Sequence, residues 1–340
     1  MKIDQEFLEE LYWEDDFDFL PIKGLQREKR RQGKIIKSSS QNLTSTEKSL
    51  LETLNQADDL REYGFSYNAS LYESSWLLDS LGLFYEDQWI SDVLNLIKGG
   101  KEASVYLCEA NPSTSIDLIA AKVYRPRMFR NLKNDHTYRE GRDRLDSDGL
   151  EIVDERMGKA IQGRTDYGLR LLHTSWIEHE FRTMKILHQA GCDVPNPLTS
   201  GYNTILMSFI GDRRLAAPTL NNIRLGRQEA KILFQRVIHN IELMLAHERV
   251  HGDLSAYNLL YWNGEITLID FPQAINPYCN PHAYPIFKRD VQHICEYFAR
   301  QGVLSEPSEL ADKLWISQDL RSESLYPIEF YDYPFNEDST

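Results

Sequence analysis

The chain has 340 residues, of which 41% are hydrophobic and 26% charged, and its formal net charge is −14. This composition supplies enough apolar side chains for a sizeable core, and it excludes a wholly disordered chain, a collagen and a coiled-coil rod. The acidic balance argues against a protein that coats nucleic acids without specificity. No apolar run reaches the ~18–20 residues that a membrane span needs, so no membrane partner is expected.

The cysteines and the N-terminus bear on the compartment. The four cysteines are far apart in the sequence and form no Cys-x-x-Cys pair, so ordinary thiols are expected rather than a zinc site. The first six residues lack the basic region and the apolar stretch of a secretory signal peptide. We therefore expect a cytoplasmic protein with reduced cysteines.

The first 90 residues divide into two parts. In residues 1–45, an acidic block from Asp4 to Asp18 precedes a basic block from Arg27 to Lys37. Blocks of like charge are typical of a solvated, flexible tail. Residues 46–90 contain short apolar segments and predict a helical extension that braces the domain after it.

From about residue 90, the pattern alternates between strands and helices. Apolar runs predict strands at 93–97, 103–108, 118–124 and 205–210. Helical spacing of apolar residues predicts helices around 177–187 and 230–245, and a last helix at 282–300. The dipeptide Asn263-Gly264 separates two short apolar runs and predicts a β-hairpin. Residues 305–340 are acidic and rich in tyrosine, and we expect a C-terminal tail there.

The most informative stretch is His-Gly-Asp-Leu-Ser-Ala-Tyr-Asn at 251–258, which is followed twelve residues after Asn258 by Asp270. Phosphoryl transfer from ATP needs a divalent cation, and Mg²⁺ prefers hard oxygen ligands such as amides and carboxylates. Asn258 and Asp270 could supply two such ligands, while Asp253 could orient or deprotonate the attacking hydroxyl. Asp and Asn are also common in turns, which is the alternative for each residue taken singly.

A kinase also needs a lysine on the phosphates and a carboxylate that holds it. Lys122 lies in the predicted strand at 118–124, where alternation puts it on one face with Ala120. Glu180 falls inside the apolar stripe of the next predicted helix, and a carboxylate on a buried face needs a cation. Taken alone, Lys122 could be a solvated lysine on an edge strand, and Glu180 could lie at the rim of its stripe.

Two further segments are candidates for contact with the nucleotide. The glycine turn at 99–105 could cover the phosphates, although it is neither Gly-x-Gly-x-x-Gly nor a Walker A loop. The end of the strand at 205–210 could connect the lobes and hold the adenine. The candidate cofactor-binding residues in these segments are Gly99, Gly100, Lys101, Ser104, Val105, Met207, Phe209 and Ile210.

Four motifs together resemble the RIO family of atypical protein kinases, and especially bacterial members of its type 1 branch. They are Gly-Lys-Glu-Ala-Ser-Val-Tyr at 100–106, Ala-Lys-Val-Tyr at 121–124, the stretch at 251–258, and Ile-Asp-Phe-Pro-Gln at 269–273. The resemblance covers roughly residues 90–303. It implies an α+β, two-lobed kinase fold with a trimmed C-lobe, with an N-lobe at 91–211 and a C-lobe at 212–304.

The resemblance also implies roles for single residues. Lys122 and Glu180 would form the ion pair that links the lobes, Asp253 would be the catalytic aspartate, and Asn258 with Asp270 would hold the metal. The expected cofactors are ATP and Mg²⁺, with Mn²⁺ as an alternative. In related proteins the aspartate of the metal loop can itself accept phosphate, so Asp270 is a candidate for that role as well.

The chain departs from the family pattern at two places. Many members carry an acidic residue where Ala256 stands, and Phe-Pro-Gln at 271–273 looks more like the type 2 branch. The segment 125–170 occupies the position of a flexible insertion in the family. Its first part, 125–144, holds seven basic and three acidic residues, an excess of 7 − 3 = +4 that could meet RNA or a ribosomal particle. Thr137 and Ser147 are candidate autophosphorylation sites there.

Four functions remain open from the sequence. The first is an ATP- and Mg²⁺-dependent serine/threonine kinase acting on itself or on a protein substrate. The second is an ATPase-driven switch that docks on ribosomal precursor particles, which the small C-lobe favours. The third is a small-molecule phosphotransferase, because the stretch at 251–258 also looks like aminoglycoside kinases. The fourth is a pseudokinase, which is weakened because every catalytic position is filled.

Overall fold

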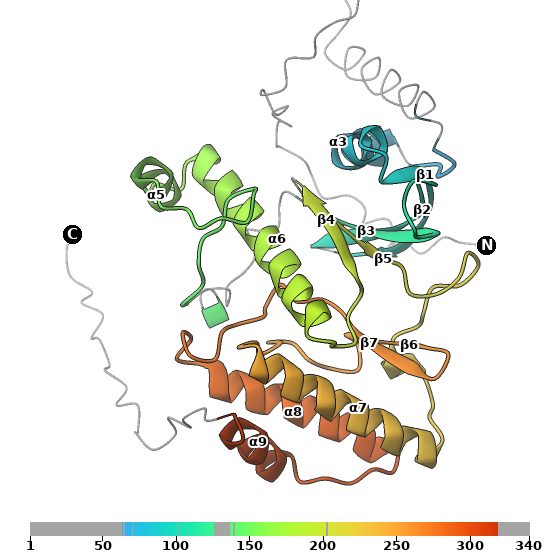
Figure 1. Ribbon diagram of the computed structural model, residues 1–340, viewed down its shortest axis with the longest axis vertical. Helices are drawn as coiled ribbons and strands as arrows, with labels where there is room; N and C mark the ends of the chain where they lie inside the picture. The colour runs from blue at the N-terminus through green and yellow to red at the C-terminus, as the bar shows by residue number, and fades with distance from the viewer. Residues whose placement is uncertain are drawn as a thin grey trace, which may run out of the picture. The chain divides into compact units, whose positions relative to one another are not determined.

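A computed structural model of the chain describes residues 63, 65–69, 71–100, 102–125, 137–138, 140–201 and 203–318 (Figure 1). The predicted tail at 1–45, most of the first part of the predicted extension, the segment 126–136 and residues 319–340 lie outside the described residues. Lys101, a candidate for nucleotide contact, lies outside them too.

The N-lobe is an antiparallel sheet of five strands. Their spatial order is β1-β2-β3-β5-β4, so the two latest strands in the sequence add to the edge formed by β3. Short connections join β1 to β2, β2 to β3 and β4 to β5, whereas the chain between β3 and β4 contains two helices. The strands are β1 (Ile90–Gly99), β2 (Ala103–Ala110), β3 (Leu118–Tyr124), β4 (Pro197–Gly201) and β5 (Thr204–Ser208).

The two faces of this sheet pack against different helices. On β3, Ile119 and Ala121 are buried with apolar residues of helix α3 (Leu71–Glu86). Ala120 and Tyr124 are buried on the opposite face, together with apolar residues of α6 (Asp166–Gln189). Side chains alternate along a strand. Lys122 therefore shares the second face with Ala120, as predicted from the sequence.

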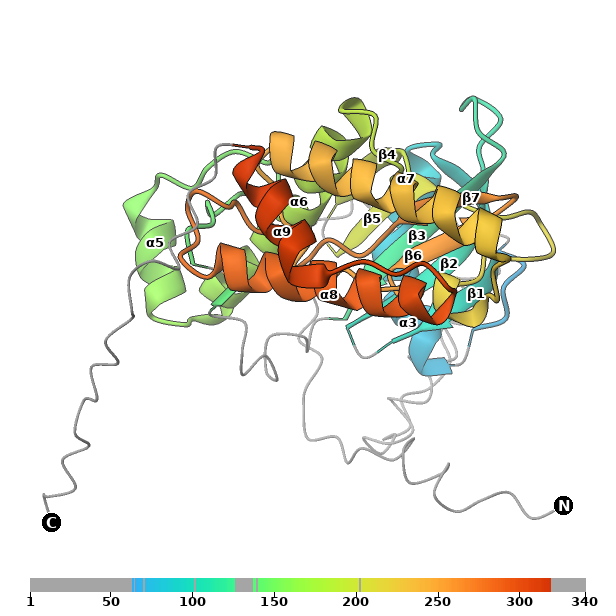
Figure 2. The same cartoon turned by 90° about the horizontal axis from the view of Figure 1, so that it is seen from below.

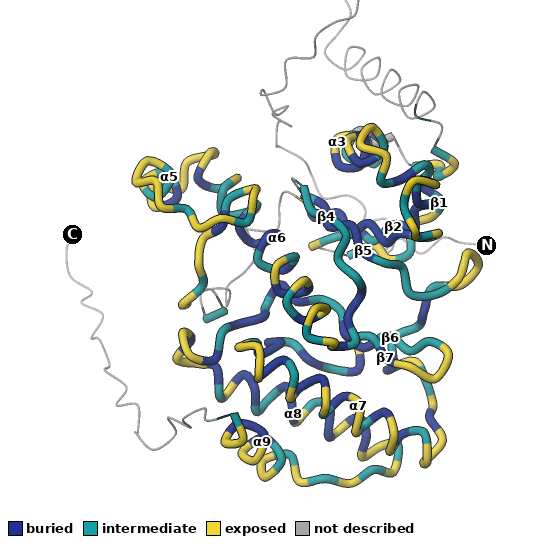
Figure 3. Tube along the Cα trace, viewed as in Figure 1, coloured by how far each residue is buried: buried dark blue, intermediate teal, exposed yellow. Residues whose placement is uncertain are grey.

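The C-lobe is made of helices and one hairpin. In Figure 1, β6 (Leu259–Trp262) and β7 (Glu265–Leu268) lie between the five-stranded sheet and helices α7 (Arg227–Ala246) and α8 (Ala283–Arg300). Asn263 and Gly264 both have positive φ, 52° and 84°, as a tight hairpin turn requires. Seen from below, α7, α8 and α9 (Pro307–Ile316) form the nearest layer (Figure 2). The tube in Figure 3 shows buried and exposed stretches alternating along α7 and α8, because each helix turns one apolar stripe to the core.

Three elements differ from the sequence expectations. Helix α9 lies inside the predicted C-terminal tail, where Ala311, Leu314 and Trp315 are buried against α8. Strand β4 was not predicted, because its sequence Pro-Leu-Thr-Ser-Gly has no alternating pattern. Helix α5 (Glu155–Gln162) and the first turn of α6 lie within the predicted insertion, and the side chains of Asp154 and Thr165 cap their N-termini. The shortest helical element is η2 (Leu220–Asn222).

The mixed architecture agrees with the predicted α+β, two-lobed fold with a reduced C-lobe. Among the helices that the structure describes, none is both long enough and apolar enough to cross a membrane. The exact lobe boundaries at 91, 211 and 304 stay predictions.

Candidate functional site

A lysine and a glutamate from distant parts of the N-lobe meet inside the protein. The Lys122 Nζ on β3 lies 2.7 Å from the Glu180 Oε1 on α6, and the side chain of Glu180 is 1% exposed. The Tyr124 hydroxyl donates to Glu180 Oε2, and the backbone N–H of Phe271 donates to Oε1 at 3.3 Å. Three donors therefore satisfy the buried carboxylate, as its desolvation demands.

The same lysine also contacts the segment after β7. Its Nζ lies 2.6 Å from the Asp270 Oδ1, so one ammonium bridges two carboxylates from different lobes. Asp270 has a φ of 73°, a left-handed conformation that is rare outside glycine and turns its side chain toward the lysine. Lys122 and Glu180 were predicted to pair, and the structure brings Asp270 to the same ammonium.

The loop at 251–258 carries the two other predicted polar residues. The Asn258 Nδ2 donates to the Asp253 backbone oxygen at 2.8 Å and to its Oδ2 at 3.1 Å. The backbone N–H of Ile269, the neighbour of Asp270, donates to the backbone oxygen of Asn258 at 3.0 Å. Hydrogen bonds thus hold the loop of Asp253 and Asn258 beside the start of the Asp270 segment.

A buried histidine ties these two segments together. The His251 ring lies 3.2 Å from the backbone oxygen of Ile269 through Nε2, and its Nδ1 accepts from the Asp253 N–H at 3.3 Å. Both contacts suit a single neutral tautomer, with the proton on Nε2. Burial lowers the pKa of His251 to about 4, although Asp270 acts in the opposite direction. The histidine therefore acts here as a neutral brace of the backbone.

The charged side chains of the site influence one another. Burial raises the pKa of Asp253, and the hydrogen bond from Asn258 only partly offsets this. Burial would also raise the pKa of Asp270, but the charge and hydrogen bond of Lys122 outweigh it, so the pKa of Asp270 lies below its usual value. Burial disfavours the Lys122 cation, yet Asp270 and Glu180 hold its pKa well above the ordinary range. At neutral pH the lysine is charged and Asp270 is ionised.

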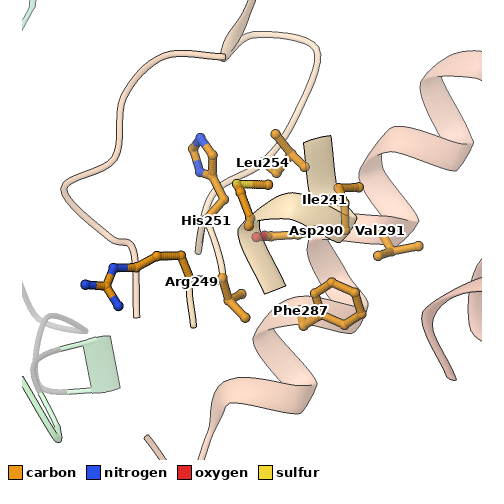
Figure 4. A pocket seen from close by; sticks show the side chains of 9 residues that line it. Ile241, Arg249, His251, Leu254, Phe287, Asp290 and Val291 are labelled. Carbon is orange, nitrogen blue, oxygen red and sulfur yellow. The ribbon is translucent and has the colours of Figure 1, made fainter. Parts of the chain in front are cut away.

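Asp290, a residue not singled out from the sequence, anchors the loop at 251–258. The Asp290 Oδ2 on α8 accepts from the Gly252 N–H at 2.8 Å, and Arg289 donates to the Gly252 oxygen. Asp290 is 2% exposed. Figure 4 shows its carboxylate in the cavity between the loop and α8, beside His251 and Leu254. That cavity holds about 10 Å³, room for no more than about one water molecule, so it cannot be a nucleotide site.

The glycine turn lies at the ends of β1 and β2, and its contact with a nucleotide stays a prediction. Gly99 pairs with Ser104 at the ends of β1 and β2, and Val105 lies opposite Lys122 across the β2–β3 ladder. Val105 packs against the core cluster that includes Ala120, on the Lys122 face. By alternation, the buried Ser104 side chain points to the opposite face, and Arg125 donates to its hydroxyl at 3.4 Å. Only the backbone of Ser104 could therefore contact a nucleotide.

The predicted lobe connector follows β5. Met207 is buried and pairs with Ala120, next to Lys122 in the core. The Phe209 N–H lies 3.4 Å from the Leu118 oxygen, and the Ile210 oxygen accepts from Ala217 at 3.0 Å. Within the described residues, the Ile210 N–H has no hydrogen-bond partner. The Ile210 N–H could therefore donate a hydrogen bond to an acceptor nitrogen at the edge of an adenine ring.

The donor set fits a single hard divalent cation. Because the Asn258 Nδ2 faces Asp253, its Oδ1 is the atom that can ligate a metal. Asp270 supplies a carboxylate, and Mg²⁺ typically takes one or two carboxylates and completes its shell with water and phosphate. Burial raises the pKa of Glu102, and the charge of Asp270 adds to the effect, while Lys122 opposes it. In the described part of the chain, no group of three or more His, Cys, Asp or Glu side chains could hold a metal ion. A metal at Asn258 and Asp270 would therefore need water or phosphate oxygens as further ligands.

Sequence reasoning could have found one of the missed residues but not the other. Tyr124 lies two residues after Lys122 on the same strand, so alternation alone puts it on the same face. Asp290 lies 38 residues after Gly252, on a helix whose apolar stripe gives no sign of a buried acid. Its partner is a backbone N–H, which leaves no trace in the sequence.

Comparisons with known proteins agree with this geometry. The family model for the RIO domain matches residues 104–310, which is more than half of the chain. The serine/threonine-protein kinase RIO1 of Chaetomium thermophilum is 31% identical over 226 residues, which cover 63% of this chain and 40% of that protein. The human RIO1 kinase is 28% identical over 215 residues, 63% of this chain and 34% of its own length.

An archaeal relative is closer in size. The RIO-type serine/threonine-protein kinase Rio1 of Haloferax volcanii is 29% identical over 220 residues, 63% of this chain and 66% of that protein. The chain thus spans well under half the length of the fungal and human relatives. The matched region contains every described polar residue of the site, from Lys122 to Asp270. With this match, the chain belongs to the RIO family.

Proposed function

We propose that the chain is an ATP- and Mg²⁺-dependent kinase of RIO type, which transfers a phosphoryl group to a serine or threonine hydroxyl of itself or of another protein. The observation that carries the proposal is the Lys122 ammonium, 2.7 Å from Glu180 and 2.6 Å from Asp270, beside the loop of Asp253 and Asn258. Phosphoryl transfer depends mainly on positioning and on charge stabilisation. This arrangement supplies both.

Each side chain has one role in the proposed reaction. Glu180 holds Lys122 in place. The Lys122 ammonium would then contact phosphate oxygens instead of Asp270. The Oδ1 of Asn258 and the carboxylate of Asp270 would hold Mg²⁺, which neutralises phosphate charge when it is bound. Asp253 orients the acceptor hydroxyl and takes its proton as the new P–O bond forms and ADP leaves. The raised pKa of Asp253 suits a group that must accept a proton.

Its proposed partners are ATP and a protein substrate, with Mn²⁺ as an alternative metal. The basic excess in the first part of the insertion supports contact with RNA or a ribosomal particle. All four cysteines lie in the described part and are free thiols, which supports a reducing compartment such as the cytoplasm.

One experiment tests the proposal. The purified protein is incubated with Mg²⁺ and γ-labelled ATP, alone and with ribosomal fractions, beside Asp253→Asn and Glu309→Gln. Glu309 is exposed on α9, so its variant matches the removal of one carboxylate charge away from the site. We expect protein-bound label with the wild type and with Glu309→Gln, and a loss of at least about a hundredfold with Asp253→Asn. Equal labelling by Asp253→Asn would contradict the proposed role.

The same incubation separates the alternatives. Label on the chain itself indicates autophosphorylation, and label on an added protein identifies a substrate. Release of free phosphate that depends on Asp253 but labels no protein would favour the ATPase-driven switch. Binding of ATP without turnover would favour a pseudokinase.

A further inference from the structure

The insertion that leaves the N-lobe after β3 contacts the C-lobe at its first described residues. Residues 137–138 and 140–145 are called the strap below. The Asn280 Nδ2 donates to the Thr137 backbone oxygen at 2.7 Å and to the Glu140 backbone oxygen at 3.1 Å. Asn280 lies just before α8 and is 4% exposed. A buried amide of the C-lobe therefore satisfies its donors on the strap.

Two further contacts join the strap to the segment between Asp270 and α8. The Arg142 Nη2 donates to the Ala274 oxygen at 2.8 Å. A Cβ on Gly141 would lie 2.2 Å from the Cys279 oxygen, so the two backbones approach more closely than any other residue type allows. These contacts fix the strap to the same segment that begins at Asp270.

Arg289 on α8 connects the strap to the loop at 251–258. Its Nη1 donates to the Tyr138 hydroxyl at 2.9 Å, and its Nη2 donates to the Gly252 backbone oxygen. A guanidinium is planar and holds its nitrogens in a fixed fork, so a hydrogen bond at one nitrogen orients the other. The Gly252 oxygen belongs to the peptide group that joins Gly252 to Asp253. One arginine therefore links the strap to the backbone of the proposed catalytic aspartate.

Little else fixes the guanidinium of Arg289. Its Nη2 makes a long contact of 3.4 Å with the Asp290 Oδ1, and its Nε is buried without a hydrogen-bond partner among the described residues. The Arg289 side chain is 40% exposed, so burial alone does not hold it in one rotamer. The Tyr138 hydroxyl therefore supplies the short side-chain contact that orients the guanidinium toward Gly252.

We propose that Tyr138 is a positioning residue for phosphoryl transfer, because its hydroxyl orients Arg289, which holds the peptide group before Asp253. Displacement of a catalytic group by about 1 Å can slow a reaction by about a hundredfold. The inference rests on the proposed kinase function for its effect on catalysis, whereas its effect on the loop at 251–258 needs no activity. A segment of the insertion thereby becomes part of the support of that loop.

The first test removes the hydroxyl and keeps the ring. Tyr138 packs against the larger core cluster, and Tyr138→Phe preserves that packing. Tyr284→Phe is the control, because the Tyr284 hydroxyl donates to Asp312 between α8 and α9. Hydrogen–deuterium exchange is measured on peptides of each protein, and circular dichroism verifies the fold. We expect exchange across 251–258 to be at least about threefold faster in Tyr138→Phe and unchanged in Tyr284→Phe.

A second pair of variants moves the strap without altering Tyr138 or Arg289. Gly141 and Gly149 have similar φ values of 75° and 71°, but a Cβ on Gly149 would come no closer than 3.9 Å to a residue beyond its two neighbours. Gly141→Ala therefore displaces the strap from Cys279, while Gly149→Ala adds only the strain of the positive φ. We expect faster exchange in the loop for Gly141→Ala and not for Gly149→Ala.

Kinetics then test the route through Arg289. Tyr138→Phe should lower the kcat of phosphoryl transfer by at least about fivefold and leave the KM for ATP within about twofold, because the residues proposed to contact ATP and Mg²⁺ are unchanged. Arg289→Lys keeps the charge but loses the fork. The double variant Tyr138→Phe/Arg289→Lys should be no slower than Arg289→Lys alone, because Tyr138 acts through the guanidinium.

Each outcome decides the proposal. Unchanged exchange across 251–258 in both Tyr138→Phe and Gly141→Ala overturns it, and so does faster exchange that is confined to the strap. In an active enzyme, an unchanged kcat of Tyr138→Phe, or losses that multiply in the double variant, would equally contradict it. If the wild type transfers no phosphoryl group, the proposed function fails, and the exchange of the loop alone decides the positioning contact.

Discussion

Lys122 and Asp270 are separated by 148 residues, yet the Lys122 Nζ lies 2.6 Å from the Asp270 Oδ1. The contact joins the sheet of the N-lobe to the hairpin of the C-lobe. It also engages one oxygen of the carboxylate that is proposed to hold the metal. In the proposed mechanism, Asp270 would hold Mg²⁺ and Lys122 would contact phosphate oxygens, so this ion pair would be given up when nucleotide is bound.

The first prediction concerns Asp270→Asn. The amide keeps the shape of the side chain but lacks the charge that attracts Mg²⁺. We expect ATP affinity in the presence of Mg²⁺ to fall by at least about tenfold, while affinity without Mg²⁺ does not fall, because the variant also weakens the contact that competes with phosphate for Lys122. Calorimetry with and without Mg²⁺ measures both. An unchanged Mg²⁺-dependent increase in affinity would remove Asp270 from the metal site.

A second prediction separates the two roles of Lys122. Lys122→Met removes the cation that faces Glu180, whose side chain is 1% exposed, and leaves a buried carboxylate with neutral donors only. Loss of one partner of a buried pair costs about 3–5 kcal/mol, so urea unfolding should show a large fall in the free energy of unfolding. The double variant Lys122→Met/Glu180→Gln should recover part of it.

Nucleotide binding provides the control for this pair of variants. Both should bind ATP at least about tenfold more weakly than the wild type, because neither has the ammonium. If the double variant is as unstable as Lys122→Met, the ion pair does not carry the stability assigned to it.

The polar residues singled out from the sequence lie together in the structure, whereas two elements at the edges of the fold, α9 and β4, were not predicted. Lys122, Asp253, Asn258 and Asp270 belong to motifs whose residue types and spacing suit the proposed phosphoryl transfer. Glu180 could be predicted from the sequence because a carboxylate inside an apolar stripe needs a cation or strong donors. For each of these residues, the local sequence pattern alone is enough to single it out.

The remaining features depend on contacts that no local pattern records. Helix α9 is defined by packing of Trp315 against Tyr284 and Phe287 of α8, rather than by a strong stripe of its own. The Asp290 carboxylate accepts a hydrogen bond from the backbone N–H of Gly252, in a loop that is distant in sequence. The Ser104 side chain was expected near the nucleotide, but alternation from Val105 turns it away, and that choice of face depends on the register of β2 against β3.

A third prediction concerns Gly252, next to Asp253. Its φ is 85°, and a Cβ there would lie 2.3 Å from the Gln273 oxygen. Gly191 has a similar φ of 82°, but a Cβ there would meet no atom within 4 Å. Gly191→Ala should cost only the conformational strain, about 1–2 kcal/mol. Gly252→Ala should cost clearly more in urea unfolding and should reduce phosphoryl transfer, because the backbone must move away from Gln273.

Comparison of the two alanine variants isolates the close contact from the strain of a positive φ. Equal losses of stability would show that the segments of Gly252 and Gln273 are not packed as tightly as the structure has them.

The last prediction uses the pH dependence of Asp290. Burial raises its pKa from 3.8 to about 7, although Arg289 and the Gly252 N–H favour the ionised form. A raised pKa means that the folded state binds this proton more tightly than the unfolded state does, so the contribution of Asp290 to stability is present below pH 4 and is lost as the pH rises to about 7. Asp290→Asn cannot titrate, and its Oδ1 can still accept from Gly252.

The difference in unfolding free energy between wild type and Asp290→Asn should therefore fall as the pH rises from about 4 to 7, by at most about 4 kcal/mol. Urea titrations at several pH values measure this difference, and contributions of other groups largely cancel in it. A difference that stays constant with pH would mean that Asp290 is ionised in the folded protein throughout, held by Arg289 more strongly than burial opposes it. The loop of Asp253 would then be anchored by a charge rather than by a neutral acid.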